Sequence, residues 1–418
     1  MTTTGADLRL KLVIAAGAAL LAGSAVAAIQ PPPSSARWIT AWATSQQALG
    51  TTTVTRATVR MIARVTIPGE AVRVRIDNTF GTVPLVIGTA YVGQRIQGAA
   101  LASGSNRQVM FNRSAGATVP PGGSVTSDAV PMRVLGQQDL AVSLYVSGEN
   151  VRPSQHTGAQ VTSYLTGNGA GDTAADEGST SFTGTTTSTF WLKAIDVSSP
   201  ASTGSIIAFG DSITDGTCST LDAHDRWEDL LGVRLALDPA GRAGAGAHKA
   251  VVNEGIGGNT ITRDNLQPPA DSPPGIDRLD RDVLTHHGVT HVILFMGTND
   301  VRREAPARQI IAGLQDVISR VKARGLKIVG VTMIPRHNRP AAENNTGWNA
   351  AKTQVRTEVN QWIRTRAPFD AVIDFDKTVQ DAKNADLIYP PFNCGDGIHP
   401  SPRGYYEMGK SVRLDLFK

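Results

Sequence analysis

The residues of this sequence that could do chemistry include Ser212, in a G-D-S triplet, and His399, in a D-x-x-H stretch that begins at Asp396. A serine hydroxyl is a poor nucleophile at neutral pH and needs a base within hydrogen-bond reach. His399 can take the proton from Ser212 and later give it to a leaving group, and Asp396 can orient the imidazole. These residue types predict covalent catalysis by a serine, provided that the fold brings them together.

The elements that must position these residues begin at Ser205, where short apolar runs start to alternate with amphipathic stretches. The expected strands are 205–209, 250–253, 292–296, 327–333 and 371–375, and the expected helices are 226–237, 309–322, 353–366 and 404–416. Such alternation predicts a parallel sheet with helices on both faces. Active sites of such sheets form outside the carboxyl ends of the strands.

Four short sequences lie at the expected strand ends or before the last helix. G-D-S with Ser212 follows the first strand, and N-x-G-x-x-G-x-T follows the second, with Gly258 as its second fixed glycine. G-x-N-D with Asn299 follows the third strand, and D-x-x-H with His399 precedes the last helix. In this order the four sequences resemble the blocks of the SGNH, or GDSL, hydrolase superfamily over about residues 205–406.

The resemblance implies a flavodoxin-like, three-layer α/β hydrolase domain and a serine hydrolase that cleaves carboxylic esters. Ser212 would be the nucleophile, His399 the base, and Asp396 the residue that orients the base. The oxyanion donors would be the backbone N–H groups of Ser212 and Gly258 and the side-chain amide of Asn299. We expect no cofactor and no metal ion, since the sequence has no C-x-x-C pair, no phosphate loop and no complete dinucleotide fingerprint.

Each of these residues also has a structural alternative. Ser212 could cap a helix, Gly258 could serve a turn, and Asn299 could belong to a turn or a cap. Asp396 and His399 could form a surface turn before Pro400. Asp211 and Asp215 flank the serine, and we expect them to shape its loop by hydrogen bonds rather than to catalyse.

Other charged and titratable residues have less specific patterns. Arg302 and Arg303 follow the Asn299 sequence; at the mouth of a cleft they would favour acidic substrates such as uronic-acid polymers, and the alternative is a solvated helix start. His286, His287 and His291 resemble a metal cluster, but the first two are adjacent and no matching carboxylate spacing follows. We therefore expect structural roles for the three histidines.

The preceding region, residues 38–197, is predicted to form an all-β domain. Short runs at 58–67, 71–76, 140–146 and 190–197 are rich in valine and isoleucine, and 71–76 alternates with the period of two typical of a strand. This spacing predicts a β-sandwich or jelly roll, with a mobile Gly/Thr/Ser-rich loop at 166–189 and a linker at 198–204. The region could bind glycan, wall the active-site cleft or only support the fold.

The first 28 residues have the layout of a secretory signal peptide, with basic residues, an apolar stretch and an A-x-A cleavage site. We expect cleavage rather than a stable membrane span, a Pro-rich tether at 29–37, a hydrolase domain at 205–418, and a secreted or periplasmic protein. The net charge is +4 with no run of like charges. This balance argues against a nucleic-acid partner.

The two cysteines are predicted to form a disulfide beside the active site. Cys218 lies six residues after Ser212, and Cys394 lies two residues before Asp396. If Ser212 and His399 meet, both cysteines are brought to the same rim, and export would let the bond persist. The alternative is two separate free thiols.

The function expected from the complete set of four sequences is hydrolysis of short acyl esters, on a small molecule or as acetyl groups on polysaccharide. A lysophospholipase or lipase is the first alternative, although no long apolar lid segment is visible in the sequence. A carbohydrate-binding protein with secondary hydrolase activity is the second.

Overall fold

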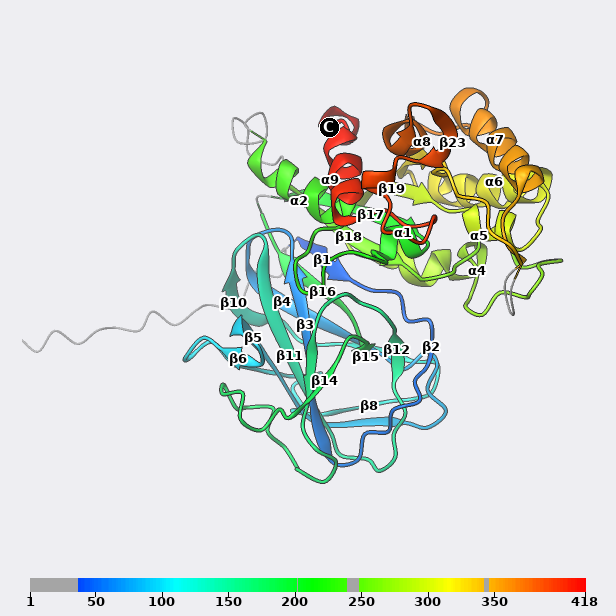
Figure 1. The fold of residues 1–418 in the computed structure, drawn as a ribbon. Helices are drawn as coiled ribbons and strands as arrows, with labels where there is room; N and C mark the ends of the chain where they lie inside the picture. The colour runs from blue at the N-terminus through cyan, green and yellow to red at the C-terminus, as the bar shows by residue number, and fades with distance from the viewer. Residues whose placement is uncertain (1–36, 201, 239–247, 342–345) are drawn as a thin grey trace, which may run out of the picture. The chain divides into compact units, whose positions relative to one another are not determined.

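The computed structural model describes residues 37–200, 202–238, 248–341 and 346–418 (Figure 1). The expected signal peptide at 1–28, and all but the last residue of the tether at 29–37, lie outside the described residues. The described part of the chain belongs to one compact unit. Every helix in that part is too short or too polar to cross a bilayer.

The β-rich region, from β1 (Trp38–Ala43) to β16 (Leu192–Ser198), contains two larger antiparallel sheets. The first has the order β1, β16, β4 (Gly69–Asp77) and β10 (Val130–Val134), with β9 (Ser124–Thr126) also paired to β4. The second has the order β14 (Gly184–Thr186), β13 (Ser163–Leu165), β3 (Ala57–Val65), β11 (Gln138–Val146), β5 (Leu85–Gln97) and β6 (Ala100–Leu101), and β7 (Arg107–Val109) and β8 (Ala117–Val119) also pair with β5. A third, small sheet has the order β15 (Thr189–Phe190), β12 (Ser154–His156) and β2 (Ala48–Leu49).

Apolar side chains from both large sheets form one core. Val59 and Met61 of β3, Val74 and Ile76 of β4, and Val142 of β11 are fully buried in it. Burying one such side chain typically contributes about 1.5–3 kcal/mol to folding. The β-rich region predicted from the alternating pattern is therefore present, with strands from 38 to 198.

Residues 166–189, expected to form a mobile loop, cover a buried arginine. Arg60 of β3 is fully buried, and its guanidinium donates to Ser143 Oγ at 2.8 Å and to the carbonyl oxygen of Asp176. The guanidinium carbon also lies 4.0 Å from the centroid of the Phe182 ring. The composition of the segment did not reveal this anchoring, because Arg60 precedes Asp176 by 116 residues.

The C-terminal region contains a five-stranded parallel sheet with the order β18, β17, β19, β20, β21. The strands are β17 (Ser202–Gly210), β18 (His248–Gly255), β19 (Val289–Phe295), β20 (Lys327–Val331) and β21 (Ala371–Ile373). In chain order this is 2-1-3-4-5, and each strand corresponds to one expected from the sequence.

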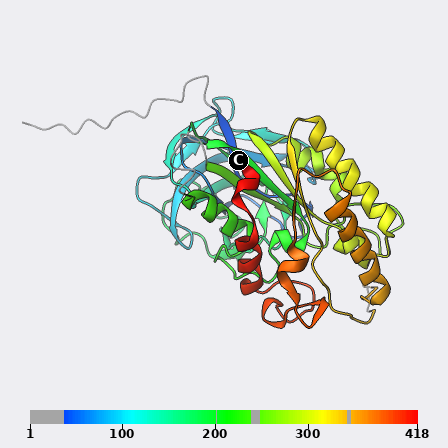
Figure 2. The same ribbon diagram turned by 90° about the horizontal axis from the view of Figure 1, so that it is seen from above.

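Helices cover both faces of this sheet, as the yellow-to-orange and the green and red helices of Figure 2 show. On one face, Ile207 and Phe209 of β17 belong to the core that contains α6 (Ala307–Ala323) and α7 (Ala350–Thr365). On the other, Ile206 and Ala208 belong to the core that contains α2 (Trp227–Leu237) and α9 (Pro402–Ser411). The last helix is shorter than predicted, since a separate turn, η3 (Leu414–Phe417), follows it.

Buried charges join the β-rich region to the parallel sheet. Lys193 Nζ of β16 lies 3.2 Å from Glu254 Oε2 and 2.8 Å from Asp282 Oδ1, and Arg278 Nη1 donates to the carbonyl oxygen of Glu254 at 2.9 Å. Charges buried in this way need partners, because an unpaired buried charge is strongly destabilising. Glu254 is the penultimate residue of β18, so the cluster fixes the strand end that leads to Gly258.

Candidate active site

Three neighbouring strand ends bring the predicted residues to one edge of the parallel sheet. β17 ends at Gly210, and Ser212 begins the short helix α1 (Ser212–Asp215). β18 ends three residues before Gly258, and Asn299 lies in α5 (Thr298–Arg302), just after β19. Because β17 pairs with both β18 and β19 in parallel, these three loops lie side by side.

The structure brings Ser212, His399 and Asp396 into one hydrogen-bonded line. Ser212 Oγ lies 2.8 Å from His399 Nε2, and His399 Nδ1 lies 2.5 Å from Asp396 Oδ2. Because a carboxylate only accepts hydrogen bonds, Nδ1–H donates to Asp396, and Nε2 is left to accept from the serine hydroxyl. In this tautomer His399 can take a proton from Ser212.

The surroundings of Asp396 keep its carboxyl group ionised. Partial burial raises its pKa, but hydrogen bonds and charge from His399, with the Ile398 N–H, outweigh burial and hold the pKa well below its usual value. Asp396 Oδ1 accepts from the backbone N–H groups of Ile398, at 2.7 Å, and His399, at 2.8 Å. The carboxylate is thus fixed in place and can stabilise an imidazolium.

Asp211, rather than Ser212, caps the short helix at the site. Its side chain accepts from the backbone N–H of Ile213 at 3.0 Å. Burial raises the pKa of Asp211 to about 7, although the Ile213 hydrogen bond and the charge of Arg336 act in the opposite direction. The serine hydroxyl is therefore not used as a cap, and Asp211 shapes the loop as expected.

Gly258 and Asn299 line the same pocket as Ser212 and His399. Gly258 has a φ of 71°, in the left-handed region that favours glycine. Asn299 Nδ2 donates to the carbonyl oxygen of Asn259 at 3.1 Å. This bond orients the amide and uses one of its two N–H groups, so the second can serve a ligand.

Asp300 ties the Gly258 loop to the helix that carries Asn299. Its carboxylate accepts from the backbone N–H groups of Ile261 and Thr262 and from the Thr262 hydroxyl, each at 2.9 Å. Burial raises the pKa of Asp300 to about 6 despite these hydrogen bonds. The aspartate of the G-x-N-D sequence therefore positions one strand-end loop relative to another.

The pocket beside Ser212 has a volume of about 250 Å³, and Arg302 and Arg336 also line it. Arg303 does not line it, because its side chain is buried and pairs with Asp271 at 3.1 Å. The possibility that Arg302 and Arg303 both lie at the cleft is therefore right for Arg302 and wrong for Arg303. One residue along a helix turns the side chain by about 100°, so adjacent arginines point in different directions.

No sequence pattern singled out Arg336. It follows β20 by five residues, is only 7% exposed, and has its guanidinium carbon 5.1 Å from the Trp348 ring centroid. Burial, followed by the charge of Arg302, lowers the pKa of Arg336 to about 10, so it remains positively charged at neutral pH. Its place after the fourth strand is the signal that could have identified it, since every strand of a parallel sheet ends at this edge.

A disulfide joins Cys218 to Cys394, with their Cα atoms 6.3 Å apart. The predicted pairing is confirmed. The backbone N–H of Cys394 also donates to the carbonyl oxygen of His399 at 3.1 Å. The bond therefore holds the loop that carries His399 against the loop that follows Ser212.

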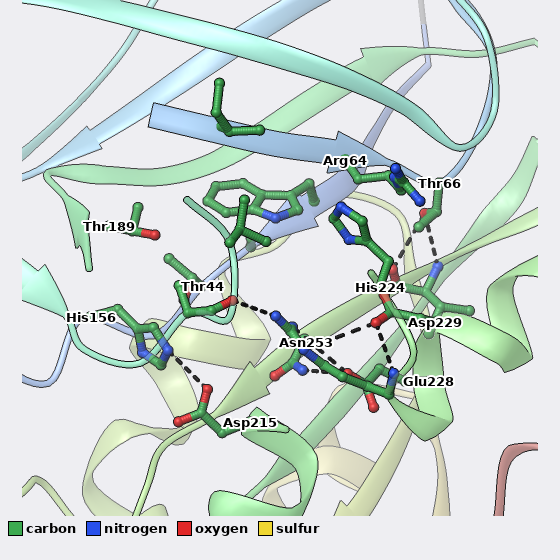
Figure 3. A pocket seen from close by; sticks show the side chains of 17 residues that line it. Thr44, Arg64, Thr66, His156, Thr189, Asp215, His224, Glu228, Asp229 and Asn253 are labelled. Carbon is green, nitrogen blue, oxygen red and sulfur yellow. Dashed lines mark hydrogen bonds and ion pairs between the residues drawn. The ribbon is translucent and has the colours of Figure 1, made fainter. Parts of the chain in front are cut away.

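Figure 3 shows a second cavity, of about 50 Å³. One wall comes from the β-rich region, and the other from residues between Asp215 and Asn253. His156 of β12 lies in it, with Nε2 3.0 Å from Asp215 Oδ1. Asp215 Oδ2 accepts from the backbone N–H of Gly257 at 2.9 Å. A side chain of the β-rich region thus reaches, through Asp215, the loop that carries Gly258. Only the tertiary structure shows this role of His156.

His286, His287 and His291 have separate partners. His286 Nε2 lies 2.5 Å from Glu254 Oε1, and His287 Nδ1 lies 3.0 Å from Asp196 Oδ2. The ring of His291 packs against the Phe417 ring, with centroids 5.5 Å apart. These contacts agree with the structural roles expected for the three residues.

Comparisons with known proteins concern the C-terminal region. Residues 208–406 match the GDSL-like Lipase/Acylhydrolase family. A carbohydrate acetylesterase from Sinorhizobium meliloti is 19% identical, with 50% of this chain and 96% of that chain covered and a TM-score of 0.37. An inhibitor-bound aryl esterase from M. smegmatis is 22% identical, with 49% and 94% covered and a TM-score of 0.38. A G-D-S-L family protein from Desulfitobacterium hafniense DCB-2 is 20% identical, with 51% and 99% covered and a TM-score of 0.37. No curated protein matches the sequence significantly.

Proposed function

Residues 208–406 of this chain belong to the GDSL-like lipase/acylhydrolase family of the SGNH superfamily, and we propose that the protein cleaves carboxylic esters through an acyl-enzyme on Ser212. The observation that carries the proposal is the hydrogen-bonded line from Ser212 Oγ through His399 to Asp396. The pocket beside this line, shared with Gly258 and Asn299, supports it.

The geometry supports a two-step reaction. In the first step Ser212 Oγ bonds to the ester carbonyl carbon while its proton passes to His399 Nε2. The tetrahedral oxyanion accepts hydrogen bonds from the backbone N–H groups of Ser212 and Gly258 and from the Asn299 amide. The bond to the alcohol oxygen then breaks, and His399 gives its proton to the leaving alcohol. In the second step a water gives a proton to His399 and attacks the acyl carbon; the bond from that carbon to Ser212 Oγ then breaks, His399 returns the proton to Oγ, and the acid is released.

The substrates that we propose are short acyl esters, including acetyl esters of carbohydrate. The pocket volume of about 250 Å³ supports a small acyl group, because pockets for drug-sized ligands typically measure about 300–1,000 Å³. The strand order 2-1-3-4-5 supports a flavodoxin-like arrangement, in which ligands bind at the carboxyl ends of the strands.

We also propose that the protein works outside the cytoplasm, with residues 205–418 as the hydrolase domain and 38–197 as an accessory domain. The layout of residues 1–28 and the Cys218–Cys394 disulfide support export, since such bonds persist in oxidising compartments.

The test is a panel of p-nitrophenyl esters of increasing acyl length, acetylated glycans and a lysophospholipid. We expect the highest kcat/KM on acetyl esters, and Ser212→Ala should retain less than about one per cent of the parent kcat, because the hydroxyl forms the covalent bond. Labelling with a fluorophosphonate should modify Ser212 in the parent protein and nothing in the variant.

Ser319→Ala is the matched control, because Ser319 lies exposed on α6 and away from the pocket. It should retain full activity. A Ser212→Ala variant as active as this control would contradict the assignment of the nucleophile. A clear preference for the lysophospholipid would contradict the proposed substrates and favour the lipase alternative.

A further inference from the structure

The pocket beside Ser212 contains two guanidinium groups that the proposed catalytic steps do not use. Arg302 and Arg336 both line it, and Arg336 is more than nine-tenths buried. Among the residues that the structure describes, Arg302 Nε and Arg336 Nη1 are buried and have no hydrogen-bond partner. A buried donor without a partner destabilises a folded protein, so this arrangement suggests a ligand that supplies the missing acceptor.

The carboxylates around the pocket are engaged elsewhere. Asp396 accepts from His399, and Asp271 pairs with Arg303 at 3.1 Å. Asp211 caps α1, and burial raises its pKa to about 7, which weakens its negative charge at neutral pH. The two arginines of the pocket therefore keep a net positive charge that no neighbouring side chain in the described part of the chain fully neutralises.

A third cation lies behind the pocket wall. Lys352 Nζ donates to the carbonyl oxygens of Arg302, at 2.9 Å, and Gly347, at 3.0 Å, and lies 3.6 Å from Glu304. These contacts occupy the N–H donors of Lys352, so the lysine stabilises the wall of the pocket and does not bind a ligand. Because Lys352 pairs with Glu304, the positive charge of the pocket comes mainly from Arg302 and Arg336.

We propose that Arg302 and Arg336 bind an anionic oxygen group, a carboxylate or a phosphate, carried by the ester substrate. A guanidinium presents planar N–H donors that match both groups. The pocket is small and shared with Ser212, so the anion would lie close to the ester bond. The inference rests on the proposed function and names its substrate class, which is acetyl esters of acidic molecules.

The test compares three acetyl esters: para-acetoxybenzoate, its neutral methyl ester and para-acetoxyphenyl phosphate. The measured quantity is the ratio of kcat/KM on a charged ester to that on the neutral one. Arg302→Gln and Arg336→Met should each lower this ratio about tenfold or more, because hydrogen bonds to charged groups are the strong ones. Differences in intrinsic reactivity cancel when a variant is compared with the parent. The charged ester with the larger change identifies the preferred anion.

Arg324→Gln is the matched control, since Arg324 is exposed at the end of α6 and its replacement removes the same charge away from the pocket. It should leave the ratio unchanged. An equal change in this variant, or no change in the two pocket variants, would contradict the proposal.

A binding measurement tests the proposal without turnover. It also remains informative if the Arg336→Met variant folds poorly. Calorimetry on Ser212→Ala should detect para-acetamidobenzoate, an amide that is not cleaved, but not its methyl ester. Adding Arg302→Gln should abolish this binding. Hydrolysis of neutral esters with no anion preference would contradict only this inference, whereas anion binding without hydrolysis of any ester would contradict only the proposed function.

Discussion

His156 Nε2 lies 3.0 Å from Asp215 Oδ1, and His156 Nδ1 lies 2.8 Å from the carbonyl oxygen of Ser45. The ring is buried, and both of its nitrogens face acceptor oxygens. Asp215 is three residues after Ser212, and its other oxygen accepts from the N–H of Gly257 at 2.9 Å. The β-rich region therefore holds, through one imidazole, the loop that supplies a proposed oxyanion donor.

We expect His156→Ala to lower kcat about tenfold with little change in KM. Without the imidazole, Asp215 can turn away from Gly257 and loosen the neighbouring Gly258 N–H. Loss of an entire oxyanion donor typically costs about 10²–10³ in kcat, so a loosened donor should cost less. Steady-state kinetics on p-nitrophenyl acetate measure both constants, and His156→Gln, which keeps a donor, should recover part of the loss.

The matched control is His224→Ala. His224 lines the same cavity (Figure 3), but its Nε2 lies near Asp139, at 3.7 Å, rather than near the Gly257 loop. If both alanine variants lose activity equally, the effect comes from the cavity as a whole and the positioning role of His156 is wrong.

Asn299→Ala should lower kcat about 10²–10³-fold and leave KM nearly unchanged, because an oxyanion donor acts mainly in the transition state. Asn384→Ala, at an exposed position of β23 (Asn384–Ile388), is the control and should behave as the parent. A variant with unchanged kcat and raised KM would show that the amide binds the ground state instead.

Reduction of the Cys218–Cys394 disulfide should lower activity before the protein unfolds. The bond closes 176 residues of chain, which corresponds to about 5 kcal/mol in the chain-entropy model, but its local effect is to hold the His399 loop. Activity and circular dichroism followed during titration with a reductant give the order of the two losses. Two free thiols per chain in the unreduced, denatured protein would contradict the pairing.

Asp211→Asn should flatten the dependence of stability on pH between about pH 4 and 7. Burial raises the pKa of Asp211 from 3.8 to about 7, so in this window the folded state keeps a proton that the unfolded state loses. The free energy of unfolding of the parent therefore falls as pH rises. An asparagine keeps the cap acceptor and removes the titration. Calorimetric Tm values across this range measure the slope, and Asp264→Asn, at an exposed site, should leave it unchanged. An equal slope in Asp211→Asn and the parent would contradict the assignment.

The residues at the strand ends could be predicted from the sequence alone. Ser212, Gly258 and Asn299 each lie three to five residues after an expected strand, and this is a local property of the chain. Because parallel strands end at one edge of their sheet, the order of the elements was enough to bring these residues together. His399 precedes the last helix instead of following a strand, so its meeting with Ser212 was expected from the family resemblance and the chemistry, and the Cys218–Cys394 pairing followed from that meeting.

The directions and distant partners of other side chains were decided only by the tertiary structure. Arg303 follows Arg302 in sequence but points away from the pocket, where Arg336 takes its place. His156 reaches Asp215 across 59 residues of chain, and Arg60 anchors a segment that its composition suggested was mobile. Such contacts depend on how complete elements pack against one another, and that packing is not encoded in the spacing of neighbouring residues.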